Sequence, residues 1–325
     1  MPPKKKKISA IIACYNDEQA IPVMHERLTA VFREIGYAHE IIFVNDGSPD
    51  DSEDVLRTLA ANDPHVVVVT HSRNFSSQNA FMSGMTVATG DAVVLLDGDL
   101  QDPPEIIKKF VEKWNEGFDV VYGIREKRET NFLLGIAYKL FYRIFSKLSY
   151  VKIPRDAGDF SLISRRVVDI IISLPERDMF IRGLRAWIGF KQTGVPYFRP
   201  ERMFGRTTNN LLKNIRWAKK GIFSFSYEPL ELVFYLAITV SFVSLLAIFV
   251  YIFLYFYVPD VPRGTSTIIV FILFFSSIQL ISISIIGEYL GRIFEEVKSR
   301  PKFIVKEILN DPKKKDSEKT TPDKD

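Results

Sequence analysis

Three carboxylates follow a short apolar run in the segment VVLLDGDLQDPPE, residues 93–105. Asp97 and Asp99 flank a glycine, and Asp102 comes three residues later. Like charges this close repel one another, and their burial is costly unless something positive lies between them. Mg²⁺ and Mn²⁺ prefer oxygen ligands and complete their shells with water and substrate phosphates. The pattern predicts a divalent metal beside Asp97 and Asp99, with Gln101 as a neutral oxygen ligand; a pair of aspartates capping a helix is the alternative.

A second polar group, Asn45-Asp46-Gly47-Ser48, also ends an apolar run. The Asp46 carboxylate can accept a hydrogen bond from a nucleobase N–H or a ribose hydroxyl, although these four residues also favour a plain turn. No G-x-G-x-x-G follows the first apolar run and no G-x-x-x-x-G-K-[ST] occurs, which argues against a dinucleotide cofactor and an ATPase P-loop. The four histidines form no metal-binding pattern and are interpreted as incidental.

Apolar runs alternate with helical patterns through the first part of the chain, which predicts an α/β domain with a mostly parallel sheet covered on both faces. Strands are expected over 8–16, 40–48, 66–74, 91–99 and 119–125, and helices over 17–36, 49–63, 77–90 and 103–117. A further strand and helix are expected over 157–175, and a last strand and loop over 190–208. Ligands of such sheets bind at the carboxyl ends of the strands, where Asp46 and Asp97 are expected.

Two long apolar segments, 230–258 and 265–290, are each long enough to span a membrane, for which about 20 residues suffice. Lys and Arg are abundant on both outer flanks, so both flanks and the N-terminal domain are expected in the cytoplasm. A buried helical hairpin of a soluble protein is the alternative. No secretory signal pattern precedes the first strand.

Four regions follow from these patterns: a cytoplasmic α/β domain (1–210), an interfacial amphipathic helix (211–229), a transmembrane hairpin (230–292) and a polar cytoplasmic tail (293–325). A second basic amphipathic stretch, 131–151, suits the membrane interface or a core-facing helix. The tail from Asn310 is expected to be disordered because it is polar and highly charged.

Composition narrows the function classes further. The chain has 325 residues, of which 47% are apolar, and a net charge of +4, too small by itself to indicate a nucleic-acid partner. The basic residues are clustered, which beside membrane spans favours lipid headgroups or phosphates. The single cysteine, Cys14, excludes an intrachain disulfide and is expected to be buried.

Six segments, in order, resemble those of family-2 glycosyltransferases with a GT-A, Rossmann-like fold. They are IIACYNDE (11–18), VNDGSPDDS (44–52), RNFSSQNAFMSGMTVATGD (73–91), LDGDLQDPPE (96–105), VYGIREKRE (121–129) and GDFSLISR (158–165). The resemblance covers roughly residues 8–300. It is strongest to the polyisoprenyl-phosphate group, which includes dolichol-phosphate mannose synthases and bacterial bactoprenol glucosyltransferases.

The resemblance implies a role for each matching residue. The nucleotide-sugar donor site would be formed by Tyr15, Asn16, Glu18, Asp46, Gly47, Ser48, Arg73 and Asp97. The phosphate of a lipid acceptor would be clamped by Arg125, Arg128, Arg202 and Arg206, for which surface salt bridges are the alternative. Asn45 stands where the family has a second aspartate, which weakens any role for that position. Cys14 and Asp17 also depart from the family pattern.

Catalysis is assigned by the same resemblance to Asp99, with the metal, and to Asp159 in the GDF segment, the position usually proposed as the base. A lipid monophosphate has a second pKa of about 6 and is already mostly dianionic at pH 7. Asp159 is therefore predicted to position the acceptor or the metal more than to take a proton. Direct attack by the phosphate would invert the anomeric centre.

The predicted function is transfer of a sugar to polyprenyl phosphate, undecaprenyl phosphate in a bacterium, at the cytoplasmic face of the inner membrane. UDP-glucose is the first expectation for the donor, with GDP-mannose and a modified arabinose donor left open. The alternatives are a processive polysaccharide synthase, a non-catalytic membrane partner and a channel or transporter. The small membrane hairpin favours a homo-oligomer.

Overall fold

The computed structural model describes residues 6–126, 157–204, 226, 228–257 and 264–314. Within this part of the chain, residues 6–126, 157–204 and 300–314 belong to one compact unit, and the apolar helices belong to a second. The amphipathic stretch predicted over 131–151 lies outside the described residues, as does nearly all of 211–229.

The first unit is built on an eight-stranded sheet with the order β7-β5-β6-β4-β1-β2-β3-β8. The strands are β1 (Lys7–Cys14), β2 (Ala38–Asn45), β3 (Val66–His71), β4 (Ala92–Asp97), β5 (Val120–Arg125), β6 (Ala157–Ser164), β7 (Gln192–Tyr197) and β8 (Val305–Leu309). β1, β3 and β4 are buried along most of their length, because helices cover both faces of the sheet.

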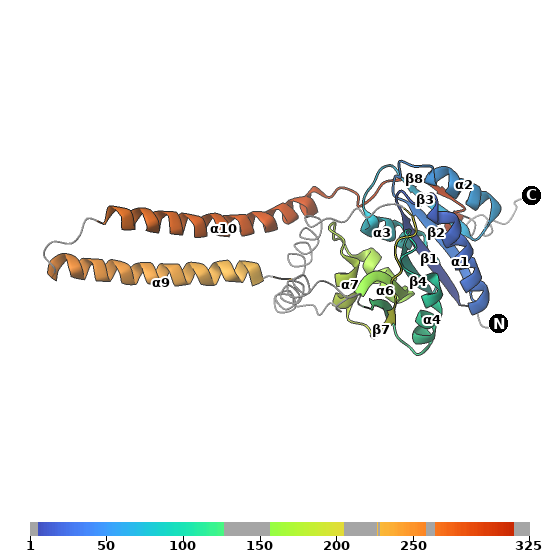
Figure 1. The fold of residues 1–325 in the computed structure, drawn as a ribbon, viewed down its shortest axis with the longest axis horizontal. Coiled ribbons are helices and arrows are strands. Elements are labelled where there is room, and N and C mark those ends of the chain that lie inside the picture. Colours follow the sequence, from blue (N-terminus) through green and yellow to red (C-terminus); the bar gives the residue numbers. More distant parts are fainter. Residues whose placement is uncertain (1–5, 127–156, 205–225, 227, 258–263, 315–325) are drawn as a thin grey trace, which may run out of the picture. The chain divides into compact units, whose positions relative to one another are not determined.

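Two layers of helices enclose the sheet (Figure 1). One layer contains α1 (Ala20–Ile35), α2 (Ser52–Asn62), the short η1 (Pro104–Ile106) and α4 (Ile107–Asn115). The other contains α3 (Ser77–Val87), α6 (Arg165–Ser173) and α7 (Ile181–Ile188). In α1, Ile21, Met24 and Leu28 recur at the spacing of one helical face and are buried, and Gly36 ends the helix in a left-handed conformation.

The sheet is mixed, where the sequence predicts a mostly parallel one. β4, β1, β2 and β3 are parallel neighbours, but β6 is antiparallel to both β4 and β5. The hydrophobic pattern of a strand indicates whether its faces are buried but not its direction. The antiparallel direction of β6 therefore could not be predicted from the sequence. Its consequence is functional, because the beginning of β6 lies at the same edge of the sheet as the end of β4.

The region predicted as a tail contributes a strand to the sheet. β8 pairs antiparallel with β3, with Val69 opposite Ile308, so residues 305–309 are ordered and belong to the first unit. Lys306 Nζ lies 3.0 Å from Glu53 Oε1, and Arg57 pairs with Glu307. β8 has only five residues, and two of them are charged. This composition is typical of a polar tail, so the sequence did not indicate a strand here.

The second unit contains the long helices α9 (Glu228–Tyr257) and α10 (Thr265–Lys298). Both are long and apolar enough to cross a membrane. Their described apolar side chains are exposed to a degree that a water-soluble surface would not tolerate, with Phe249 69% and Phe256 74% exposed. α10 continues to Lys298, past the predicted end of the span at residue 290.

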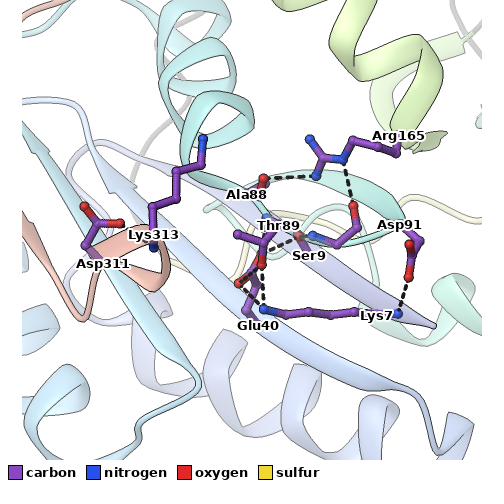
Figure 2. A network of polar contacts seen from close by, with 10 residues as sticks. Lys7, Ser9, Glu40, Ala88, Thr89, Asp91, Arg165, Asp311 and Lys313 are labelled. Atoms are coloured by element: carbon purple, nitrogen blue, oxygen red, sulfur yellow. Dashed lines mark hydrogen bonds and ion pairs between the residues drawn. The ribbon is translucent and has the colours of Figure 1, made fainter. Parts of the chain in front are cut away.

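The amino ends of the central strands are joined by a buried carboxylate (Figure 2). Glu40 on β2 accepts hydrogen bonds from Lys7 Nζ at 2.6 Å, Ser9 Oγ at 2.6 Å and the backbone N–H of Thr89 at 2.7 Å. Arg165 donates to the carbonyls of Ala88 and Gly90 beside this group. The network lies at the end of the strands opposite the predicted site and is structural.

Candidate active site

Sheet topology brings the predicted acidic residues to one edge. Cys14, Asn45 and Asp97 are the last residues of the parallel strands β1, β2 and β4. Asp159 is the third residue of the antiparallel β6, whose Ser161 pairs with Leu95. The carboxyl ends of the parallel strands and the amino end of β6 therefore meet, and Asp159 lies beside Asp97 rather than far from it.

The carboxylates at this edge repel one another. Burial, together with the neighbouring Asp102, Asp99 and Asp159, raises the pKa of Asp97 to about 8. Burial also raises the pKa of Asp102, which is 1% exposed and whose Oδ2 has no hydrogen-bond partner among the described residues. A buried carboxylate oxygen without a donor is costly, so this group has the excess negative charge that a divalent cation would relieve.

Tyr197 at the end of β7 holds Asp102 in place. Its hydroxyl donates to Asp102 Oδ1 at 2.6 Å, and burial together with this carboxylate holds the pKa of Tyr197 well above its usual value. Arg125 Nε lies 3.5 Å from the same hydroxyl. A Cβ on Gly158 would come within 2.8 Å of Arg125 Nη2, so this glycine makes room for the guanidinium. Arg125 is thus partly buried among the carboxylates, not in a surface salt bridge.

The loop after β7 brings two further arginines to the carboxylates. Arg199 lies 4.0 Å from both Asp99 Oδ2 and Asp102 Oδ1. Arg202 lies 3.8 Å from Asp17 Oδ1 and 3.8 Å from Asp99 Oδ2. These separations are ion pairs rather than hydrogen bonds, so the arginines neutralise the acidic group without filling its lone pairs. Burial raises the pKa of Asp17 to about 6, which Arg202 opposes.

The turn after β4 packs closely on the loop after β1. The space beside Gly98 is filled by the protein, because a Cβ there would lie 2.7 Å from Asp17 Oδ2 and 3.0 Å from Ala13 O. Gln101 donates from its backbone to Asp99 Oδ1 at 3.2 Å and from Nε2 to the carbonyl of Pro200 at 3.2 Å. Its side chain therefore links the Asp99 turn to the arginine loop.

The end of β2 forms a second part of the site. Asp46 is 2% exposed, and its Oδ1 accepts from His71 Nδ1 and from the backbone N–H of Phe75, each at 2.8 Å. Asn45 accepts from the backbone of Ser48 at 2.9 Å, so the turn predicted as an alternative does form around Asp46. Gly47 has a φ of +64°, and a Cβ there would lie 2.5 Å from the carbonyl carbon of Arg73.

The loop after β1 is joined to this turn. The backbone N–H of Asn16, whose φ is +58°, donates to Ser48 Oγ at 3.2 Å. Glu18 donates from its backbone to Asp50 Oδ2 at 3.1 Å and accepts from the backbone of Asp51 at 3.1 Å. Tyr15 is 42% exposed, and the Arg73 guanidinium stacks over Phe75 at 4.4 Å. The residues predicted for the nucleotide thus come together on the loops after β1, β2 and β3.

Asp159 is fixed by residues that the sequence did not identify. Gln78 Nε2 donates to Asp159 Oδ2 at 3.0 Å, while Gln78 Oε1 accepts from the backbone of Ile181 at 2.9 Å. Arg182 Nε lies 3.3 Å from Asp159 Oδ1. Arg185 donates to the carbonyls of Gly158 and Asp159, and burial lowers its pKa to about 10. Asp159 Oδ2 is therefore hydrogen-bonded, whereas Oδ1 has an ion-pair partner but no hydrogen-bond partner among the described residues.

Two predicted phosphate ligands, Arg128 and Arg206, lie outside the described residues. In the part that is described, no three His, Cys, Asp or Glu side chains form a complete metal-binding group. Asp97, Asp99 and Gln101 fit a cation only as part of a shell that water and donor phosphates complete. The additional residues at the site are Gln78, Asp102, Arg182, Tyr197 and Arg199. Of these, only Asp102 carries a sequence signal, as the third carboxylate of its segment.

Comparison with known proteins assigns the family. A sequence profile described as "Glycosyl transferase family 2" matches residues 9–171. The chain belongs to glycosyl transferase family 2. The glycosyltransferase activity class and the GT-A fold class predicted from the sequence are thereby confirmed.

Relatives of this glycosyltransferase are similar over more than 90% of the chain. An uncharacterized glycosyltransferase of Bacillus subtilis, YkcC, is 43% identical over 91% of this chain and 92% of its own. An SfII prophage-derived bactoprenol glucosyl transferase of Shigella flexneri is 41% identical over 92% of this chain and 97% of its own. A solved glucosyl-3-phosphoglycerate synthase from Mycobacterium tuberculosis, in complex with Mn²⁺, UDP-glucose and phosphoglyceric acid, is 18% identical over 67% of this chain and 78% of its own, with a TM-score of 0.45.

Proposed function

We propose that this glycosyltransferase moves glucose from UDP-glucose to a polyprenyl phosphate, undecaprenyl phosphate in bacteria, at the cytoplasmic face of the inner membrane. The observation that carries the proposal is the meeting of Asp97, Asp99 and Asp102 with three arginines at one sheet edge. Similarity to bactoprenol glucosyl transferases over more than 90% of both chains supports the lipid acceptor. Two helices apolar enough to span a bilayer support its location.

The donor is proposed to bind across the two halves of the site. The nucleoside would lie on the turn that contains Asp46, and the diphosphate would lie toward Asp97 and Asp99. A divalent cation held by Asp97, Asp99 and Gln101 would neutralise the leaving diphosphate. Asp102, with its buried unpaired oxygen, adds negative charge to the same place.

The acceptor phosphate is proposed to meet the arginines. Arg125, Arg199 and Arg202 lie close to the carboxylates, and a guanidinium binds phosphate oxygens through a rigid fork of donors. The phosphate oxygen attacks the anomeric carbon, the bond from that carbon to the diphosphate breaks, and the nucleoside diphosphate leaves with the electron pair. This displacement inverts the anomeric centre. Asp159, between Gln78 and Arg182, positions these groups.

The proposal is tested by transfer from radiolabelled UDP-glucose to undecaprenyl phosphate in detergent, with Mg²⁺ or Mn²⁺. Asp99→Ala is expected to lose at least about 10²-fold in kcat/KM, the range found when a group that stabilises developing charge is removed. Asp169→Asn is the matched control, since this carboxylate is exposed and, among the described residues, pairs with Arg165 on the same helix at 3.5 Å. NMR of the lipid product reads the anomeric configuration directly.

Each result distinguishes an alternative. Product with GDP-mannose but none with UDP-glucose would keep the mechanism and change the donor. Metal-independent transfer, or full activity in Asp99→Ala, would overturn the assigned roles of the carboxylates. Nucleotide binding without transfer from any donor would favour a non-catalytic membrane partner.

A further inference from the structure

His71, at the end of β3, is the one histidine of the four that is completely buried beside the site. Its Nδ1 lies 2.8 Å from Asp46 Oδ1, and its Nε2 lies 2.8 Å from Ser83 Oγ on α3. A carboxylate only accepts hydrogen bonds, so Nδ1 is the donor to Asp46. The His71 ring thus links Asp46 to α3 through one hydrogen bond at each nitrogen.

The bonds to Asp46 are asymmetric. Oδ1 accepts from His71 and from the backbone of Phe75, whereas Oδ2 has no hydrogen-bond partner in the described part of the chain. Two donors to one oxygen restrain the orientation of the carboxylate, and the second oxygen is left to accept from a ligand. A nucleobase that presents a ring N–H, such as uracil or guanine, has the complementary donor.

The His71 ring is itself held by aromatic contacts. Phe75 meets it edge-on at 5.6 Å, and Phe303 stacks on it at 5.5 Å with an interplanar angle of 9°. Phe303 belongs to the segment between α10 and β8. The backbone N–H of Ser72 donates to the carbonyl of Ile304 at 3.0 Å, and Lys302 Nζ donates to the carbonyl of Leu174 at 2.6 Å, so residues on both sides of Phe303 are fixed.

We propose that His71 is a positioning residue that aims Asp46 at the donor nucleobase, and that Phe303, in the segment after the last membrane helix, completes this support by stacking on the imidazole. The inference rests on the proposed function. It assigns the C-terminal segment a part in donor binding, in addition to membrane attachment.

The experiment measures binding of UDP and of GDP to the purified full-length protein in detergent, by calorimetry, and then the donor KM, acceptor KM and kcat. His71→Asn places an amide N–H near the position of Nδ1, whereas His71→Gln places it near Nε2. We expect His71→Asn to bind the nucleotide within about threefold of wild type, and His71→Gln and His71→Ala to bind it about tenfold more weakly or worse, the loss expected for one hydrogen bond to a charged group.

Phe303→Ala is expected to weaken nucleotide binding about three- to fivefold, since it removes one aromatic contact and leaves the hydrogen bond to Asp46. In all these variants the acceptor KM should stay within about twofold of wild type.

Two matched controls are available. His25→Ala removes another His–Asp pair, 2.9 Å to Asp63, and Ile304→Ala removes a neighbouring apolar side chain that is 52% exposed. Both should bind nucleotide as wild type does.

Wild-type nucleotide affinity in His71→Gln or in Phe303→Ala would overturn the inference, as would an equal rise of donor and acceptor KM, which indicates a general structural role. If no His71 variant folds, the nucleotide affinity of Phe303→Ala tests the inference by itself. Phe303 is partly exposed and should tolerate truncation better than the buried His71. Failure of the wild-type protein to bind UDP or GDP would instead overturn the proposed function, and the inference with it.

Discussion

At the scale of single residues, the site is a balance between buried carboxylates and arginines. Asp97, Asp99 and Asp102 repel one another, and the arginines that lie near them are too distant to satisfy their oxygens. Such an arrangement is costly in the free protein, and binding of a cation and a phosphate would relieve both charges at once. The repulsion between the carboxylates therefore lowers the stability of the free protein and favours binding of a cation and a phosphate.

Asp159 provides the first prediction at this scale. Its Oδ2 accepts a hydrogen bond from Gln78 at 3.0 Å, and its Oδ1 forms an ion pair with Arg182 at 3.3 Å, so these two residues fix the orientation of the carboxylate. We expect Asp159→Asn to lower kcat only a few-fold and to leave the pH profile of kcat/KM unchanged in shape. A loss of about 10³-fold together with the disappearance of one limb of the profile would identify a general base instead.

The residues that sequence patterns could predict are those that occur in a short contiguous motif. Asp46, Asp97 and Asp99 follow apolar strands, and all three lie at the expected edge of the sheet. Gln78, His71 and Tyr197 reach the same edge from separate elements, and none of them belongs to a recognisable metal-binding or catalytic motif. Only the fold reveals that they contact the predicted carboxylates, because their significance depends on a partner distant in sequence.

At the scale of elements, the turn after β2 must pack directly on the loop after β3. Gly47 has a positive φ, and a Cβ there would lie 2.5 Å from the backbone of Arg73. We expect Gly47→Ala to cost about 3 kcal/mol or more, as conformational strain and a clash add, and to weaken UDP binding as the two loops separate. Gly117→Ala is the matched control, since its φ is +89° but nothing lies within 4 Å.

Gly117→Ala should lower the free energy of unfolding by about 1 kcal/mol, from conformational strain alone, and should leave the UDP affinity unchanged. Melting temperature and calorimetric binding measure the two effects separately. Equal behaviour of the two alanine variants would show that close packing of the loops contributes nothing.

The opposite end of the same strands supplies a pH-dependent prediction. Burial alone would raise the pKa of Glu40, but hydrogen bonds from Lys7, Ser9 and Thr89 outweigh it and hold the pKa below its usual value. The stability from this group is therefore fully present above about pH 4.5 and is lost as the pH falls through the lower folded-state pKa. Glu40→Gln should cost about 2 kcal/mol at pH 7, or about 4–8 °C in melting temperature.

The difference in melting temperature between wild type and Glu40→Gln should stay constant from pH 6 to pH 8 and shrink below pH 4.5. A difference that is the same at pH 3.5 and at pH 7 would contradict the assigned role of the charge. Nucleotide affinity at pH 7 should not change, because this network lies at the far end of the strands.

Strand direction and the last strand were the elements that the sequence could not supply. β6 and β4 are both buried along most of their length, but β6 is antiparallel to its neighbours and β4 belongs to the parallel group. β8 is short and carries Lys306 and Glu307. Their ion pairs with Glu53 and Arg57 on α2 become evident only in the folded structure. The helices α9 and α10 were predicted well, since a long apolar run has few alternatives.

At the scale of the whole molecule, the catalytic unit is discontinuous in sequence. The chain leaves it before α9, passes through the apolar hairpin and returns with residues 300–314. The returning segment pairs with β3, and Asn310 donates to the carbonyls of Ala60 at 2.7 Å and Val66 at 2.9 Å. The membrane hairpin is thus an insertion into the catalytic unit rather than an appendage at its end.

Two shortened chains would test this arrangement. One ends at residue 227, and the other replaces residues 228–299 by a flexible Gly/Ser linker of about 12 residues and keeps the C-terminal segment. Ending the chain at 227 removes β8 and leaves the donors and acceptors of β3 unpaired at an open sheet edge. We expect this chain to melt at least about 5 °C below the linker variant in the same detergent, a loss of roughly 2 kcal/mol, and to aggregate sooner.

The linker variant should also bind UDP more tightly, since it retains Phe303 against His71. Identical melting temperatures and affinities would show that the returning segment is dispensable to the catalytic unit, and that the hairpin serves as a terminal anchor alone.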